Sequence, residues 1–129
     1  MGYWIVKTEP SSYSYADLEK EGKAVWDGVK NPLALKHLRS MATGDSVFVY
    51  HTGNEKSVVG LAKVASQDAK VGLPVLEAVR PLARPVPLAE VKADKTFSDL
   101  GLVRMGRLSV MPASPAQFRA LAKLGGVSI

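Results

Sequence analysis

The segment 25–31 (VWDGVKN) places a large flat aromatic side chain, Trp26, in a polar stretch between two helical patterns. Binding residues gather on loops that a rigid scaffold holds in place. The indole face suits stacking against a planar ring, and the neighbouring acid, cation and Asn31 amide suit hydrogen bonding to its edge. The alternative is that Trp26 covers one end of a small core, with its indole N–H bonded to the backbone. The segment by itself agrees with both interpretations.

Three more segments carry polar side chains at or near the ends of predicted strands: residues 7–10 (KTEP), 50–52 (YHT) and 104–109 (RMGRLS). Taken singly, each is typical of a solvated strand end, a hairpin shoulder or a surface loop. If the three converge on Trp26, they form a pocket with an aromatic floor, hydrogen-bonding edges and a cationic rim. Such a pocket suits a base flipped out of a nucleic acid strand, because the base needs a stacking face and its phosphates need Lys or Arg.

The sequence carries few of the residues that catalysis or metal binding requires. It has no cysteine, which excludes a disulfide, a thiolate nucleophile and a thiolate metal site. Its two histidines, His37 and His51, fall in different predicted elements, and no carboxylate repeats at ligand spacing beside them. No Gly-x-Ser-x-Gly elbow, P-loop or dinucleotide fingerprint occurs. We therefore expect no metal, no cofactor and no catalytic residue, and a binding module rather than an enzyme.

Two other hypotheses stay open. In one, the protein is an enzyme that acts on a nucleotide or small metabolite, with His51 as the acid–base group and Lys7 as the electrophile. In the other, it is a protein-interaction domain in which Trp26 is structural. A pH–rate profile on a candidate substrate tests the first, and binding to a protein surface without any nucleotide effect supports the second.

The charge is moderately basic and unevenly distributed. The net charge is +5, with an excess of +1 in residues 1–65 and +4 in residues 66–129. This bias permits a phosphate-bearing partner, although it is weaker than that of a strong duplex binder. Arg104 and Arg107 flank a predicted strand in the more basic half and are the candidate phosphate-binding residues, with Lys7 as a third.

The elements that position these side chains are short. Strands are predicted at 3–6, 47–51, 58–64, 75–82 and 108–111, where β-branched and aromatic residues gather, and Pro81 implies an edge or a bend. Helices are predicted at 15–21, 32–41, 88–93 and 118–124, with one helical turn within 97–102. Ser14, with Asp17 three residues on, opens the first helix, and residues 114–117 (SPAQ) form a capping-box signature with proline at the first helical position for the last. The order indicates an α+β fold: a small, curved, mostly antiparallel sheet or barrel surrounded by short helices.

Length and composition predict one compact domain over residues 1–129. The hydrophobic fraction is 47% and the charged fraction 22%, which suits a real core. No stretch approaches the ~20 apolar residues of a membrane span, and the N-terminal apolar run is too short for a signal peptide. We expect a soluble, cytoplasmic monomer without membrane association.

Seven segments, in order, resemble the EVE domain, a PUA-like family related to YTH domains and to the thymocyte nuclear protein family. Each alone is weak, but their shared order and spacing over residues 2 to about 124 make the resemblance strong. The segments are YWIVKTEP (3–10), VWDGVKN (25–31), LRSMATGD (38–45), VFVYHTG (47–53), VVG (58–60), VRPL (79–82) and LVRMGRLSV (102–110).

The resemblance implies a PUA-like pseudo-barrel and a pocket for a modified or flipped nucleobase of DNA or RNA. By motif position, the implied nucleobase-binding residues are Lys7, Thr8, Trp26, Asn31, Tyr50, His51, Leu108 and Ser109.

Two segments depart from the family pattern. Residues 32–37 (PLALKH) stand where many relatives place Tyr-x-Ala-Arg-Asn, so one pocket wall is expected to differ. The link 66–72 (SQDAKVG) is shorter than usual, which indicates either a trimmed hairpin or residues missing from the chain. Both departures predict a more open base-contacting side than in relatives.

Overall fold

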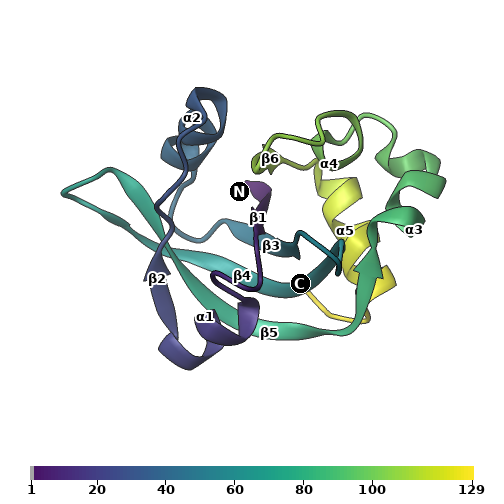
Figure 1. The fold of residues 1–129 in the computed structure, drawn as a ribbon, viewed down its shortest axis with the longest axis horizontal. Coiled ribbons are helices and arrows are strands. Elements are labelled where there is room, and N and C mark those ends of the chain that lie inside the picture. The colour runs from purple at the N-terminus through teal and green to yellow at the C-terminus, as the bar shows by residue number, and fades with distance from the viewer. Residues whose placement is uncertain (1) are drawn as a thin grey trace.

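The computed structural model describes residues 2–129 and is built on one six-stranded sheet. The strands are β1 (Tyr3–Thr8), β2 (Lys23–Val25), β3 (Ser46–His51), β4 (Ser57–Asp68), β5 (Leu73–Pro87) and β6 (Val110–Pro112). The helices are α1 (Tyr15–Glu21), α2 (Pro32–Ser40), α3 (Leu88–Ala93), the 3-10 turn η1 (Lys95–Phe97), α4 (Gly101–Arg104) and α5 (Pro115–Gly125). Figure 1 shows α3, α4 and α5 gathered at one end of the curled sheet, with α1 and α2 at the other.

The strand order is β2-β5-β4-β3-β1-β6. The β1–β3 pair is parallel and the other four pairs are antiparallel, which confirms the predicted α+β fold with a mostly antiparallel sheet. No pairing joins β2 to β6 within residues 2–129, so the sheet curls without closing and a closed barrel is not formed. Both edge strands are only three residues long, which leaves little backbone to pair across the seam.

Local capping signals set the helix boundaries. Ser14 and Asp17 form a capping box at the start of α1, and Ser114 and Gln117 form another at the start of α5. The predicted bounds of α1 and of the helix at 88–93 are confirmed, although α3 has no side-chain cap, and α2 follows the predicted 32–41 within one residue. No helix in residues 2–129 is long and apolar enough to cross a membrane.

Several predicted elements are longer or shifted in the structure. Strand β2 was not predicted, β4 and β5 extend well past the predicted 58–64 and 75–82, and the last strand lies at Val110–Pro112 rather than 108–111. Pro81 pairs with Gly60, next to a shift in the β4–β5 register, so the pairing is irregular at this proline.

The short link 66–72 completes a tight β4–β5 hairpin. Asp68 pairs with Leu73, and the Asp68 carbonyl accepts from the Gly72 N–H at 2.8 Å. The Asp68 carboxylate accepts from the N–H groups of Lys70 and Val71 at 2.9 and 3.3 Å. Asp68 thus holds the turn between β4 and β5 with three hydrogen bonds.

Two close side-chain contacts fix the positions of α5 and α1 on the sheet. The Phe48 and Phe118 rings stack with centroids 4.2 Å apart, which joins α5 to the sheet. The Tyr15 ring lies directly on Gly60, where a Cβ atom would come within 2.3 Å of it, and its hydroxyl donates to the Leu61 carbonyl at 2.6 Å. Only glycine leaves room for this ring, so Gly60 fixes where α1 lies on the sheet.

Candidate functional site

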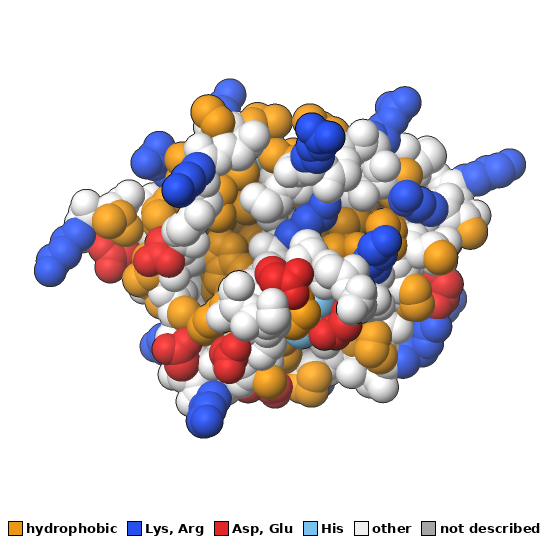
Figure 2. Space-filling model, viewed as in Figure 1, with side chains coloured by type: hydrophobic (Ala, Val, Ile, Leu, Met, Phe, Trp, Pro, Cys, Tyr) orange, Lys and Arg blue, Asp and Glu red, His pale blue; other side chains and the backbone are white. Residues whose placement is uncertain are grey.

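A cavity of about 610 Å³ occupies the gap where the curled sheet fails to close. On one side, Trp26 continues the β2–β5 pairing by donating its backbone N–H to the Pro74 carbonyl at 2.9 Å. On the other side, Lys7 continues the β1–β6 pairing by donating its backbone N–H to the Ser109 carbonyl at 2.8 Å. Side chains from both edges and from the segment 26–31 line the cavity. Figure 2 shows a hollow with a hydrophobic floor on this face, with Lys and Arg side chains above it and Asp and Glu side chains gathered below.

Trp26 borders the cavity although only 6% of its surface is exposed. Its indole N–H donates to no protein group within residues 2–129, yet no side-chain nitrogen or oxygen in this part of the chain is both buried and unpartnered. The indole N–H therefore reaches solvent and is free to donate to a ligand. The two interpretations of Trp26 are compatible, since most of its ring packs in the core while its edge faces the cavity.

Tyr13 is the second aromatic wall of the cavity, and sequence reasoning missed it. Its ring meets Trp26 edge to face, and its hydroxyl donates to the Glu21 carboxylate. Burial, the hydrogen bond to Glu21 and the charge of that group raise the pKa of Tyr13 above its usual value. The signal was present in the sequence, because Tyr13 is also an aromatic in a polar connecting segment.

Lys7 lies between the cavity and the loop that follows α4. Its ammonium donates to the Gly106 carbonyl at 2.9 Å and lies 5.6 Å from the centre of the Tyr50 ring. Burial lowers the pKa of Lys7 from its usual value of 10.5, since it disfavours the charged form. One of its three N–H groups is used internally, so the remaining two are left for a ligand.

Thr8 and Glu9 shape the cavity wall at the end of β1. The Thr8 hydroxyl donates to the Tyr13 carbonyl at 2.6 Å, which commits its only proton and leaves its oxygen as an acceptor. The Glu9 carboxylate accepts from the Ser11 N–H and hydroxyl and from the Thr52 hydroxyl. The hydrogen bonds from Ser11, followed by that from Thr52, lower the pKa of Glu9.

Asn31 lies at the border between this cavity and a second one. Its side-chain oxygen accepts from the Ala34 N–H at 3.0 Å and so caps α2. Its side-chain nitrogen donates to no group within residues 2–129 and remains available. Asn31 thus caps α2 through its oxygen and keeps a free donor on its nitrogen.

The first cavity is richer in acceptors than its predicted cationic character implied. Three carboxylates line it, against two ammonium groups. The carboxylates are Glu9, Glu21 and Asp27, and the cations are Lys7 and Lys30. Its polar walls are therefore suited to a ligand that presents N–H donors on its edge.

The second cavity, of about 410 Å³, shares Asn31 with the first and lies between the start of α2 and the loop after α4. Arg104 and Arg107 line it, together with Leu108. The predicted site residues thus divide into two groups. The first cavity is bordered by Lys7, Thr8, Trp26 and Ser109. The second is bordered by Arg104, Arg107 and Leu108, and Asn31 borders both.

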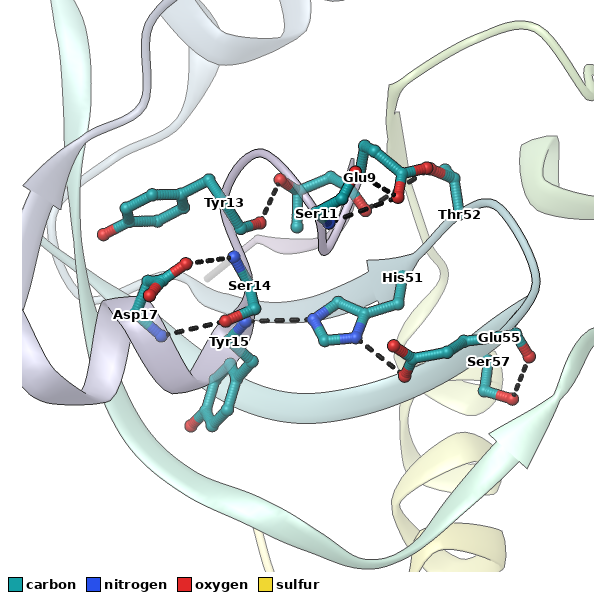
Figure 3. Close-up of polar contacts among 11 residues, drawn as sticks. Glu9, Ser11, Tyr13, Ser14, Tyr15, Asp17, His51, Thr52, Glu55 and Ser57 are labelled. Atoms are coloured by element: carbon teal, nitrogen blue, oxygen red, sulfur yellow. Dashed lines mark hydrogen bonds and ion pairs between the residues drawn. The ribbon is translucent and has the colours of Figure 1, made fainter.

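Tyr50 and His51 border neither cavity, contrary to their predicted position in the pocket. Both are buried on the inner strand β3, and Lys7 covers the Tyr50 ring. The His51 Nε2 accepts from the Tyr15 N–H at 2.9 Å, and its Nδ1 lies 3.0 Å from the Glu55 carboxylate (Figure 3). With both ring nitrogens engaged, His51 anchors the start of α1, and it does not share a cavity with Lys7 as the enzyme hypothesis requires.

Metal binding has no suitable donor set in the described part of the chain. No group of three or more His, Asp or Glu side chains within residues 2–129 is placed to hold a metal ion.

Comparisons with known proteins connect this geometry to a family. The EVE domain model matches residues 2–124. Mouse (Mus musculus) thymocyte nuclear protein 1 is 29% identical over 164 residues, covering 95% of this chain and 73% of that protein. The NMR structure of a Rhodopseudomonas palustris protein is 34% identical with a TM-score of 0.88, covering 98% of this chain and 94% of that one.

A crystal structure of human THYN1 protein in complex with 5-methylcytosine-containing DNA superposes with a TM-score of 0.85. It is 23% identical and covers all of both chains, so this likeness shows the shared fold. The family model spans nearly the whole sequence, and the same fold recurs in both solved structures. The chain belongs to the EVE domain family.

Proposed function

We propose that this chain is a noncatalytic module that binds nucleic acid carrying a modified base, with DNA as the first candidate, and that the base enters the first cavity. The observation that carries the proposal is the cavity at the open seam of the sheet. It combines two aromatic walls, the free Trp26 indole N–H and three carboxylates. Its volume of about 610 Å³ falls in the range of ~300–1,000 Å³ typical of small-ligand sites.

The polar groups of the cavity suit the edge of a base with an exocyclic amine. Glu and Asp carboxylates accept hydrogen bonds from such an amine, as they do from cytosine N4 in protein–DNA complexes. The Trp26 indole and the Asn31 amide supply the complementary donors for a ring nitrogen or carbonyl. The 5-methylcytosine-containing DNA bound to human THYN1 is a ligand of this chemistry, which supports the choice of DNA and of a cytosine-type base.

The affinity of such a module must come from both base stacking and phosphate contacts. Stacking of one base on an aromatic side chain contributes ~1–3 kcal/mol, whereas unpairing and unstacking the base costs a few kcal/mol. For a paired base, the stacking energy gained in the pocket therefore roughly balances the cost of taking the base out of the duplex. Net affinity must come from phosphate contacts, for which Arg104 and Arg107 beside the second cavity are the best placed cations.

Fluorescence anisotropy with two labelled duplexes, identical except for one 5-methylcytosine, tests the proposal. We expect tighter binding to the modified duplex and an affinity that falls as salt rises. Arg104→Gln and Arg107→Gln should each reduce the slope of log affinity against log salt by ~1. Arg84→Gln is the matched control, because Arg84 pairs with Glu90 away from both cavities. Equal affinity for the two duplexes, or no binding at low salt, contradicts the proposal.

The noncatalytic part has its own measurement. We expect the modified oligonucleotide to keep its mass after prolonged incubation with excess protein. A mass change that depends on the protein would show an enzymatic activity and reject this part of the proposal.

A further inference from the structure

Two large apolar side chains stand exposed at the second cavity. Leu33, in the first turn of α2, is 39% exposed, and Met105, directly after α4, is 47% exposed. Both line the cavity of about 410 Å³. They are two of the five large hydrophobic side chains exposed within residues 2–129, and they come from segments far apart in the sequence to border the same cavity. Exposed apolar groups held together in this way mark an interaction site.

The surroundings of this apolar pair favour a polyanion. Arg104 and Arg107 line the same cavity, and no carboxylate does. Asn31 connects the cavity directly to the base-binding cavity next to it. An exposed apolar pair flanked by cations suits contact with stacked bases whose phosphates lie on either side, so the duplex beside the bound base is the partner that these groups favour.

Both apolar side chains are held on short, well-anchored segments. The Met105 N–H donates to the Gly101 carbonyl at 2.7 Å, and the Met105 carbonyl accepts from the Leu108 N–H at 2.9 Å. The Lys7 ammonium holds the adjacent Gly106 carbonyl. On the other side, the Asn31 cap fixes the first turn of α2 and so the position of Leu33. The backbone that carries the pair is therefore in place before any partner arrives, which lowers part of the entropic cost of inserting it.

We propose that Leu33 and Met105 form an apolar wedge that enters the base stack of duplex DNA and fills the space left by the base that moves into the first cavity. The inference rests on the proposed function, because a wedge is needed only if a paired base leaves the duplex. Proteins that unstack or kink DNA insert apolar side chains of this kind between base steps. The wedge removes the void in the stack, and the free energy of burying its surface offsets part of the cost of flipping.

The test compares two duplexes that share the same 5-methylcytosine strand. In one the modified base is paired with guanine, and in the other it faces an abasic site, so that it leaves the stack at little cost. Leu33→Ala and Met105→Ala each remove three side-chain heavy atoms. Each variant should bind the paired duplex about tenfold more weakly, the loss expected if about two of those atoms are buried against the DNA. Both should bind the abasic duplex within about twofold of the wild type.

Two controls accompany these variants. Met105→Leu keeps a large apolar side chain and should retain the wild-type affinity for the paired duplex. Val71→Ala removes an equally exposed apolar side chain, 50% exposed, from the β4–β5 turn, and should change neither affinity.

The possible results separate the wedge from the proposed function. Equal losses on both duplexes, or no loss on either, overturn the wedge while base binding stands. Failure of the wild-type protein to bind either duplex overturns the proposed function and the wedge with it.

Discussion

The rings of Tyr13 and Trp26 meet edge to face, with centroids 6.1 Å apart and planes inclined by 78°. This pair joins the turn before α1 to the segment after β2, so it closes one end of the cavity. Because the two planes are nearly perpendicular, a planar base that stacks on one ring meets the other edge-on. Trp26 is almost fully buried, whereas Tyr13 is half-buried, so Tyr13 offers the more accessible ring face.

Tyr13→Ala is therefore expected to weaken binding of the modified duplex by ~1–3 kcal/mol, the contribution of one stacked base. Tyr13→Phe keeps the ring and removes only the hydrogen bond to Glu21, so it should retain most of the affinity. Anisotropy titrations of the two variants measure the difference, and thermal unfolding checks that both are folded. Unchanged affinity in Tyr13→Ala would show that the base does not stack on this ring.

The intrinsic emission of Trp26 reports on the same site. Trp4 is first replaced by Phe, so that Trp26 is the remaining indole. Saturation with the modified duplex should then change the emission of Trp26, because the ligand contacts its exposed edge. Emission and iodide quenching that stay constant at saturation contradict this placement.

Asn31 allows the helix cap and the ligand donor to be separated. Asn31→Ser keeps an N-cap side chain for α2 but removes the free amide nitrogen, so it should leave the melting temperature unchanged and cost ~1–3 kcal/mol of affinity. Asn31→Ala loses both functions and should also lower the stability by ~0.5–2 kcal/mol. Wild-type affinity in Asn31→Ser would assign Asn31 to the helix alone.

His51 is expected to matter for folding and not for binding. His51→Ala leaves the buried Tyr15 N–H without an acceptor, which should lower the free energy of unfolding by ~1–3 kcal/mol. His51→Gln restores an acceptor and should recover part of that loss. Urea denaturation measures the stability, and titrations at a temperature where all variants are folded should give equal affinities. A loss of affinity without a loss of stability would return His51 to the binding site.

Asp45 links the N-terminal segment to the sheet and should make stability depend on pH. Its buried carboxylate accepts from the Gly2 N–H, the Trp4 indole and the Ala42 N–H at 2.8–2.9 Å. Burial raises the pKa of Asp45, but these hydrogen bonds outweigh it and hold the pKa below 3.8 in the folded state. The stabilisation is thus fully present above the unfolded-state pKa and is lost as the pH falls through the lower folded-state pKa.

Asp45→Asn should cost ~1–3 kcal/mol at neutral pH, because the amide turns one acceptor oxygen into a donor that faces other donors. The difference in stability from the wild type should shrink as the pH is lowered past 3.8. Denaturation at a series of pH values measures this. A difference that stays constant into acid would show that Asp45 acts through packing rather than through its charge.

The helix starts could be predicted from the sequence because their causes are local. Ser14 bonds to the N–H of Asp17, and Ser114 to that of Gln117, so each cap involves residues three positions apart. No distant part of the chain is needed to form these bonds, and the predicted starts were accordingly confirmed. The family resemblance was visible for a related reason, since it rests on short segments and their order along the chain.

Strand β2 and the two-cavity site could not be predicted in the same way. Lys23–Val25 carries too few residues for a pattern and becomes a strand because β5 pairs with it. Lys7 and Tyr50 are paired in the β1–β3 register. The family motifs that contain them therefore suggest that both belong to one site. Only the strand order shows that β1 lies near the open seam whereas β3 is one strand further in, where Lys7 covers Tyr50.

The sequence by itself determined the fold class, the family, the helix caps and the aromatic Trp26 tract, all of which depend on neighbouring residues or on their order. The tertiary structure alone decided that Tyr13 contacts Trp26, that His51 borders neither cavity, and that Leu33 and Met105 border the same one. Each of these depends on which elements the curled sheet brings together across its seam. That proximity arises from pairing between distant strands, and the residues that it brings together show no common pattern in the sequence.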